Sequence, residues 1–264
     1  MPIAWPMLIA QHIDSIEANG RQLADAARNA GWDAPIPGLD WDVRALVTHV
    51  GGVHRWAADT VTTASRGTAA TAPRANDLDA AARVGSGPGD DELLDWFAQG
   101  LETLVQALRA APADIECFTF LPAPSPLAFW ARRQAHETAV HRADAEAATG
   151  TTPEFSPAFA QDGIDEMLTG FARRRNPRST TPATFVLAPD DGGARWLVSL
   201  GDERIVGTQL DDDSSGAAGE PQVRVCGSSS ALYLWLWNRS SAVAFRGDRA
   251  AADLWSSVQR VRWS

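Results

Sequence analysis

The stretch SPLAFWARRQAHETAVHRADAEAATG, residues Ser125–Gly150, carries the signals of one long helix at both ends. Ser125 is a residue type that caps helix N-termini, and Pro126 suits the first helical position, where an N–H group is not needed. Gly150 stands just past the pattern, where glycine commonly ends a helix. We therefore predict a helix that begins at Pro126 and ends shortly before Gly150.

Three further helices of similar length are predicted before this one. Their apolar residues recur at intervals of three and four, as on the buried face of a helix. Asp40 is the expected N-cap of the second helix, and Gly31 is the expected end of the first. The three segments are residues 8–31, 39–65 and 90–111. Four long helices joined by connections indicate an up-and-down four-helix bundle.

After a fifth helical pattern at residues 156–175, the apolar residues alternate with a period of two, which is typical of strands. Four short strands are predicted, followed by a helix, a strand and a helix; the segments are 183–189, 194–201, 204–210, 221–227, 228–240, 242–248 and 249–261. The acidic stretch Leu210–Pro221 is expected to be a mobile loop. The predicted fold class is α plus α+β, with a helical bundle at residues 1–176 and a small α+β domain at residues 177–264.

The composition excludes several classes of partner. The chain of 264 residues has 23 basic and 33 acidic residues, a formal net charge of −10, and no lysine. Nucleic-acid binding needs clustered cations, and the one basic cluster, Phe171–Asn176, is typical of a helix end or a linker. The chain has no apolar run near the roughly 18 residues of a membrane span and no signal-peptide features. We expect a cytoplasmic protein that binds neither nucleic acid nor membrane; the sequence predicts no oligomeric state.

The two cysteines, Cys117 and Cys226, are far apart in the sequence and neither lies in a CxxC motif. Such a pair does not make a disulfide framework. Both are therefore expected to be structural residues of a protein from a reducing compartment.

The segment HETAVHRADAE, residues His136–Glu146, holds two of the five histidines in the chain. Residues four apart share a face of a helix, so Glu137 and His141 can point at one ion. Residues five apart differ by about 140–160°, which separates His136 from His141. Asp144 lies near the face of His141. Imidazole and carboxylate bind zinc and similar divalent ions, so the segment indicates part of a metal site; the alternative is a solvated helix face.

A catalytic zinc usually has three protein ligands, so a third ligand would come from another helix. The candidates are His12, His49 and His54. His54 lies within the apolar stripe of its helix and His49 near the edge of that stripe, so periodicity alone would select His54. However, a histidine in such a stripe is more often a core residue, and a ligand that lines an open pocket can lie at the edge. The residue pattern leaves the choice open.

Two motifs resemble the mycothiol-dependent maleylpyruvate isomerase family, part of the wider DinB-like bundle superfamily. The first, Trp-x-Val-Arg-x-Leu-x-x-His, falls on residues 41–49, and the second, His-Glu-x-x-x-His-x-x-Asp, on residues 136–144. The second half of the chain is similar to the C-terminal domain of the family, of sterol-carrier-protein-like type. The resemblance thus covers nearly the whole chain and implies a DinB-like four-helix bundle followed by a small α+β domain.

The resemblance also implies a set of metal ligands. The zinc ligands of the family fall on His49, Glu137 and His141. The expected cofactor is therefore a divalent metal, and zinc is the metal that the resemblance implies. His54 and His136 would then surround the site or be structural.

Two further residues are expected to take part in catalysis. Asp144 would orient a ligand or shape the pocket, as carboxylates near metal-bound histidines commonly do. Arg83 lies in the connection between helices where the family can supply an arginine for the carboxylates of the substrate; a surface arginine is the alternative.

The resemblance implies mycothiol, a low-molecular-weight thiol, as cosubstrate. A divalent ion favours the thiolate, which is the nucleophile, and the expected activity is that of a maleylpyruvate cis-trans isomerase or a mycothiol S-transferase. One alternative is a metal-dependent hydrolase, with water in place of the thiol. The other is a non-enzymatic protein that holds an apolar ligand near residues 232–237.

Overall fold

The computed structural model describes residues 7–66, 87–172, 179–201, 205–210 and 221–259. Contacts divide the chain into two compact units, of which one is Leu8–Pro153 and the other begins at Glu154. The segment at 157–171 belongs by its contacts to the second unit, whereas the bundle predicted from the sequence extends to residue 176. Residues 211–220 of the predicted acidic loop, and the arginines of the basic cluster, lie outside the described residues.

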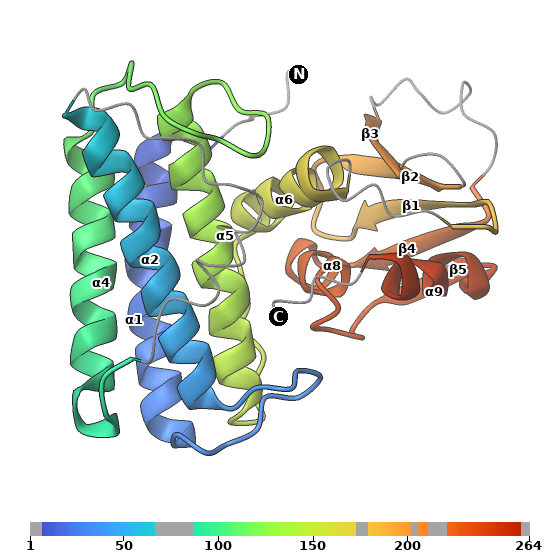
Figure 1. The fold of residues 1–264 in the computed structure, drawn as a ribbon. Coiled ribbons are helices and arrows are strands. Elements are labelled where there is room, and N and C mark those ends of the chain that lie inside the picture. Colours follow the sequence, from blue (N-terminus) through green and yellow to red (C-terminus); the bar gives the residue numbers. More distant parts are fainter. Residues whose placement is uncertain (1–6, 67–86, 173–178, 202–204, 211–220, 260–264) are drawn as a thin grey trace. The chain divides into compact units, whose positions relative to one another are not determined.

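The first unit is a bundle of long helices, as predicted. Its helices α1 (Ile9–Ala30), α2 (Val43–Ser65), α4 (Asp90–Ala110) and α5 (Pro126–Ala147) lie side by side along their lengths (Figure 1). Each long helix buries an apolar set in the common core, including Ile16, Leu23, Leu46, Val50, Phe97 and Leu104. The period-3.6 pattern of the sequence is therefore explained by burial within the bundle.

The helix ends agree with the predicted signals at three of four positions. The hydroxyl of Ser125 accepts the backbone N–H of Ala128 at 3.1 Å, and α5 begins at Pro126. Gly31 and Gly150 have positive φ angles of 82° and 76°, which suit glycine after a helix end.

The predicted N-cap Asp40 was wrong, because α2 is capped by Asp42. The Asp42 carboxylate accepts the backbone N–H of Ala45 at 2.7 Å. Asp42 also forms an isolated bridge with Pro35, and the carbonyl of Trp41 accepts the N–H of Ile36 at 2.9 Å. These contacts hold residues 35–42 outside the helix, so the second aspartate of the pair takes the capping position.

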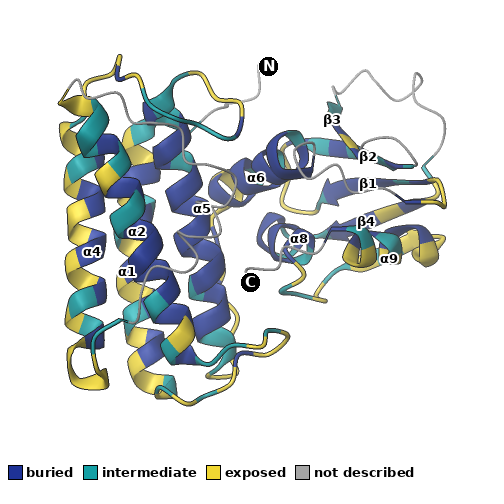
Figure 2. Cartoon of the chain, viewed as in Figure 1, coloured by how far each residue is buried: buried dark blue, intermediate teal, exposed yellow. Residues whose placement is uncertain are grey.

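Helix α5 differs from the others because it is buried around most of its circumference (Figure 2). Its buried residues include seven polar side chains: Arg133, Gln134, His136, Glu137, Thr138, His141 and Asp144. Buried polar groups cost free energy unless they are paired. The burial of so many of them on one helix points to a function in this part of the bundle.

The second unit contains a five-stranded sheet in the order β3-β2-β1-β4-β5. Its elements are α6 (Pro157–Asp165), the π-helix η1 (Glu166–Phe171), β1 (Ala183–Pro189), β2 (Arg195–Leu200), β3 (Val206–Leu210), β4 (Val223–Gly227), α8 (Ser229–Leu236), β5 (Ala244–Gly247) and α9 (Arg249–Val258). Strands β1 and β4 pair in parallel and the other neighbours are antiparallel. This confirms the predicted α+β class, although the sequence predicted one continuous helix where α6 continues as a π-helix.

The core of the second unit lies between the sheet and helices α8 and α9. The Phe185 ring on β1 contacts Trp235 of α8 and Trp255 of α9, at centroid distances of 5.7 and 6.0 Å. Leu232 and Trp237 are at most 1% exposed, as are the neighbouring Leu234 and Leu236. The apolar run at 232–237 therefore forms core, and the open cavity of about 560 Å³ nearby is lined partly by arginine and serine. Neither observation favours an apolar ligand in this unit.

Among the described helices, none is both long and apolar enough to cross a bilayer.

Candidate metal centre

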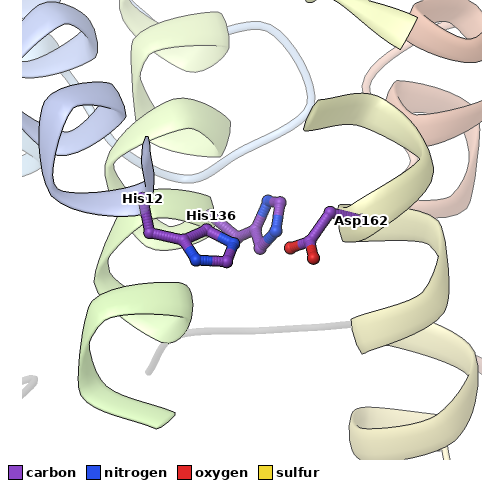
Figure 3. Close-up of side chains that lie close together, drawn as sticks. All are labelled: His12, His136 and Asp162. Atoms are coloured by element: carbon purple, nitrogen blue, oxygen red, sulfur yellow. The ribbon is translucent and has the colours of Figure 1, made fainter. Parts of the chain in front are cut away.

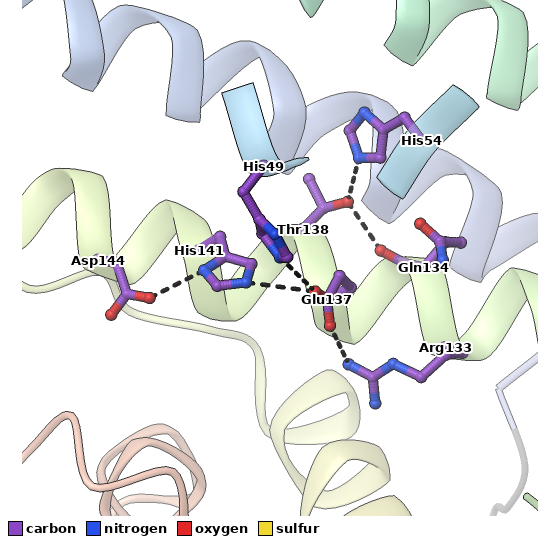
Figure 4. A network of polar contacts seen from close by, with 8 residues as sticks. All are labelled: His49, His54, Arg133, Gln134, Glu137, Thr138, His141 and Asp144. Atoms are coloured by element: carbon purple, nitrogen blue, oxygen red, sulfur yellow. Dashed lines mark hydrogen bonds and ion pairs between the residues drawn. The ribbon is translucent and has the colours of Figure 1, made fainter. Parts of the chain in front are cut away.

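Three buried polar side chains from two helices of the bundle converge (Figure 4). His49 projects from α2, and Glu137 and His141 project from α5. The Oε1 atom of Glu137 lies 3.5 Å from His49 Nε2 and 3.2 Å from His141 Nε2. Each of the three residues is at most 5% exposed. The structure thus brings together the three residues that the resemblance implied as ligands.

This donor set fits a divalent ion. Two imidazole nitrogens and one carboxylate oxygen are a usual protein ligand set of a catalytic zinc, and one atom from each residue lies within 4.8 Å of the others. Ligand atoms about 2.1 Å from one tetrahedral ion would be about 3.4 Å apart. The measured separations of 3.2 and 3.5 Å lie on either side of that value. A fourth position would be available to an external ligand.

His54 lies in a different environment, although it is as deeply buried as His49. Its Nε2 is 2.9 Å from the hydroxyl oxygen of Thr138, and that hydroxyl donates to the carbonyl of Gln134 at 2.8 Å. Because the hydroxyl proton is used there, His54 Nε2 carries a proton and donates. Burial, opposed by the charge of Glu137, lowers the pKa of His54 to about 3. His54 is therefore a neutral residue that links α2 to α5.

His141 is oriented by a carboxylate on its far side. Its Nδ1 lies 2.9 Å from Oδ2 of Asp144, so Nδ1–H donates to Asp144 and Nε2 faces Glu137. Burial alone would lower the pKa of His141, but the hydrogen bonds to Asp144 and Glu137 outweigh it and raise the pKa to about 9. A carboxylate in this place fixes the tautomer and the ring orientation of a ligating histidine.

Glu137 divides its two oxygens between different partners. Oε1 faces the two imidazoles. Oε2 lies 3.2 Å from Nη2 of Arg133, and Arg133 is only 2% exposed. Burial raises the pKa of Glu137, but the bonds from His141 and His49 and the positive charges of His141 and Arg133 hold that pKa well below its usual range. Arg133 has no predicted role, although its spacing of four residues from Glu137 is visible in the sequence.

Trp41 is a second residue without a predicted role. It belongs to the first motif, and its ring contacts both His49 and His141, at centroid distances of 4.8 and 6.1 Å. The sequence gives no sign of these contacts. Trp41 precedes α2, so helical periodicity does not place its ring, and the contact with His141 is made to a different helix, α5.

The remaining histidines form a pair of their own. His12 on α1 and His136 on α5 are buried, with ring centroids 6.2 Å apart at an interplanar angle of 71° (Figure 3). His136 does not belong to the donor set of His141, in agreement with the helical spacing. Arg83, the predicted residue for substrate carboxylates, lies outside the described residues.

The two cysteines have no disulfide bond. Cys226 is buried, and burial raises the pKa of the Cys117 thiol. A raised pKa disfavours the thiolate that a nucleophilic cysteine needs.

These features define a four-helix-bundle protein with a buried His-Glu-His centre suited to a divalent metal, followed by an α+β unit. The family model described as "Mycothiol maleylpyruvate isomerase N-terminal domain" matches residues 13–146, which include all three donors, and the model "MDMPI C-terminal domain" matches residues 158–254. The chain therefore belongs to the mycothiol-dependent maleylpyruvate isomerase family, as the two motifs indicated.

Solved structures show the same fold. The chain is similar to a crystal structure of the mycothiol-dependent maleylpyruvate isomerase, with a TM-score of 0.65 and 15% identity over 90% of this chain and 93% of that chain. It is equally similar to a crystal structure of a histidine-to-alanine mutant of that isomerase, with a TM-score of 0.64 and 16% identity over the same shares. None of the curated proteins compared with the chain matches it.

Proposed function

We propose that the chain is a mycothiol-dependent enzyme whose divalent metal, zinc in the first place, is held by His49, Glu137 and His141. The observation that carries the proposal is the convergence of these three donors inside a chain of this family. The similar solved structures are described as mycothiol-dependent maleylpyruvate isomerases, which supports a thiol as the second reactant.

The residues around the donors have separate tasks in this proposal. A bound divalent ion supplies positive charge that favours the thiolate form of a thiol at neutral pH. Asp144 holds the proton on Nδ1 of His141 and so keeps Nε2 available as a ligand atom. Arg133 holds the other oxygen of Glu137 and balances its charge. The burial of all three donors keeps bulk water away from the reacting groups.

Two reactions fit a thiol nucleophile. In an isomerisation, the thiolate sulfur adds to one carbon of a conjugated double bond, the resulting single bond rotates, and the thiolate leaves as the double bond re-forms in the trans geometry. In an S-transfer, the carbon–sulfur bond is kept: after addition the neighbouring carbon takes up a proton, and after substitution a leaving group departs from the attacked carbon with its electron pair. Neither reaction needs a cysteine of the chain, and the raised pKa of Cys117 agrees with that. Arg83 is the proposed partner of the carboxylates of the substrate, and the protein would act in the cytoplasm, where the thiol pool is reduced.

The test is turnover of maleylpyruvate, and of a bimane electrophile, by the zinc-loaded protein with and without mycothiol. We expect turnover of one of them that requires both the thiol and the metal. Turnover that needs the metal but no thiol would contradict the proposal and support a hydrolase. Binding of an apolar ligand by a protein that takes up no metal would support a non-enzymatic binding protein.

A further inference from the structure

Trp41 touches the imidazoles of both histidines in the donor set, which come from different helices. Its ring centroid is 4.8 Å from that of His49 at an interplanar angle of 51°, and 6.1 Å from that of His141 at 25°. Both distances lie in the range of about 4.5–7 Å in which aromatic rings attract each other. The His49 and His141 rings themselves meet edge-on at 5.2 Å. The indole and the two imidazoles therefore form one three-ring cluster.

The backbone around Trp41 is fixed on both sides. The carbonyl of Trp41 accepts the N–H of Ile36 at 2.9 Å, and the N–H of Val43 donates to the carbonyl of Ala34 at 3.1 Å. The next residue, Asp42, is held by its bridge to Pro35 and by its cap on α2. The indole is thus presented from a segment tied to the start of the helix that carries His49, so it is placed before any ligand binds.

The orientation of an imidazole ring decides whether its nitrogen points at an ion, because the lone pair lies in the ring plane. The χ2 torsion of histidine has broad minima, so neighbours must select one ring plane. Asp144 does this for His141 through Nδ1. The indole of Trp41 packs against both rings and so restricts both torsions together. The indole is also partly exposed, whereas the three donors are buried.

We propose that Trp41 is a positioning residue that sets the ring planes of His49 and His141 and thereby the metal affinity of the centre; this rests on the proposed metal site. Loss of a residue that orients metal ligands typically weakens metal binding by about 10–100-fold. We therefore expect about tenfold weaker Zn²⁺ binding in Trp41→Leu. Trp41→Phe keeps an aromatic ring in place, and its Zn²⁺ affinity should stay within about threefold of the unaltered protein.

Trp32 offers a matched control, because it is partly buried, belongs to the same connection and is held through its carbonyl to the N–H of Arg44. The experiment measures Zn²⁺ dissociation constants by competition with a chromophoric chelator, beside the unfolding temperature of each metal-free variant. Trp32→Leu should lower the unfolding temperature about as much as Trp41→Leu does. Its Zn²⁺ affinity should stay within about twofold of that of the unaltered protein. If Trp41→Leu does not fold, Trp41→Met takes its place, because its flexible side chain can fill part of the space without a rigid ring.

Two outcomes would overturn the role of Trp41. One is unchanged Zn²⁺ affinity in Trp41→Leu or Trp41→Met, and the other is an equal loss of affinity in Trp32→Leu, which would indicate general loosening of the connection. Failure of the unaltered protein to bind Zn²⁺ would overturn the metal centre itself. The two failures are therefore distinguishable without any measurement of turnover.

Discussion

His49 Nε2 on α2 lies 3.5 Å from Glu137 Oε1 on α5, and this contact joins the two sequence motifs in space. The distance is longer than the 2.7–3.2 Å usual for an N–H···O hydrogen bond. It matches instead the separation of about 3.4 Å between two ligands of one tetrahedral ion. The separation of the two atoms is therefore compatible with a shared ion, and without an ion the two side chains form a long polar contact.

The ligand set can be tested by removing single donors. We expect His49→Ala and Glu137→Ala to bind Zn²⁺ at least about 100-fold more weakly than the unaltered protein, because each loses one of three protein ligands. The control is His54→Gln, which changes a buried histidine on the same helix that donates to Thr138. It should retain stoichiometric metal in elemental analysis. Metal retained in His49→Ala but lost in His54→Gln would mean that periodicity had selected the right histidine.

Metal binding should depend on pH because His141 must lose a proton to become a ligand. Its pKa of about 9 means that the imidazole is protonated at neutral pH in the protein without metal. The apparent Zn²⁺ affinity should therefore rise by up to about tenfold per pH unit between pH 7 and 9, with release of a proton. Calorimetry in buffers of different ionisation enthalpy counts that proton. Asp144→Asn removes the main bond that raises the pKa, so in this variant the affinity should level off at a lower pH.

The same pKa makes a prediction about the stability of the protein without metal. The pKa of His141 is raised from 6.5 to about 9 on folding, so its contribution is fully present below pH 6.5 and is lost as the pH rises through 9. The free energy of unfolding should fall by about 3 kcal/mol as the pH rises from 6.5 to 9. Urea unfolding at pH 6.5 and pH 9 in the presence of a chelator measures it. If the free energy of unfolding of Asp144→Asn falls by the same amount between pH 6.5 and pH 9, the pH dependence comes from groups other than His141.

The parts of the fold that were predictable are those with local causes. Ser125, Pro126 and Gly150 define the ends of α5 through their own backbone chemistry, and the sequence shows them directly. The choice between Asp40 and Asp42 depended on a bridge to Pro35, which is a contact outside the helix. Both aspartates satisfy the same capping rule, so only the folded chain distinguishes them.

The candidate site shows the same division. The pair Glu137 and His141 followed from helical spacing, whereas the choice of His49 over His54 needed the family resemblance. The structure explains why: both histidines are buried on α2, but His49 meets Glu137 on α5, whereas His54 meets its neighbour Thr138. A shift of one residue across a helix interface is not encoded in the periodicity of either helix.

Arg133 gives the last prediction, because it compensates the charge of a buried ligand. Its guanidinium holds Glu137 Oε2, and both side chains are at most 5% exposed. Removing one partner of a buried ion pair leaves a charge without full compensation, which costs on the order of 3 kcal/mol. We expect Arg133→Met to lower the free energy of unfolding by about this amount in urea titrations of the protein without metal.

Arg142 is the matched control for that experiment. It forms an ion pair four residues apart on α5 with Glu146 at 2.5 Å, with the two side chains 14% and 16% exposed, and it also donates to Asn19 Oδ1 at 3.1 Å. Because water can still reach both charged groups, Arg142→Met should cost less than Arg133→Met, about 1–2 kcal/mol with the bond to Asn19 included. Equal losses in the two variants would show that Arg133 contributes only packing. In that case the low pKa of Glu137 would rest on the two histidines alone, and the carboxylate would be free to turn both oxygens toward a bound ion.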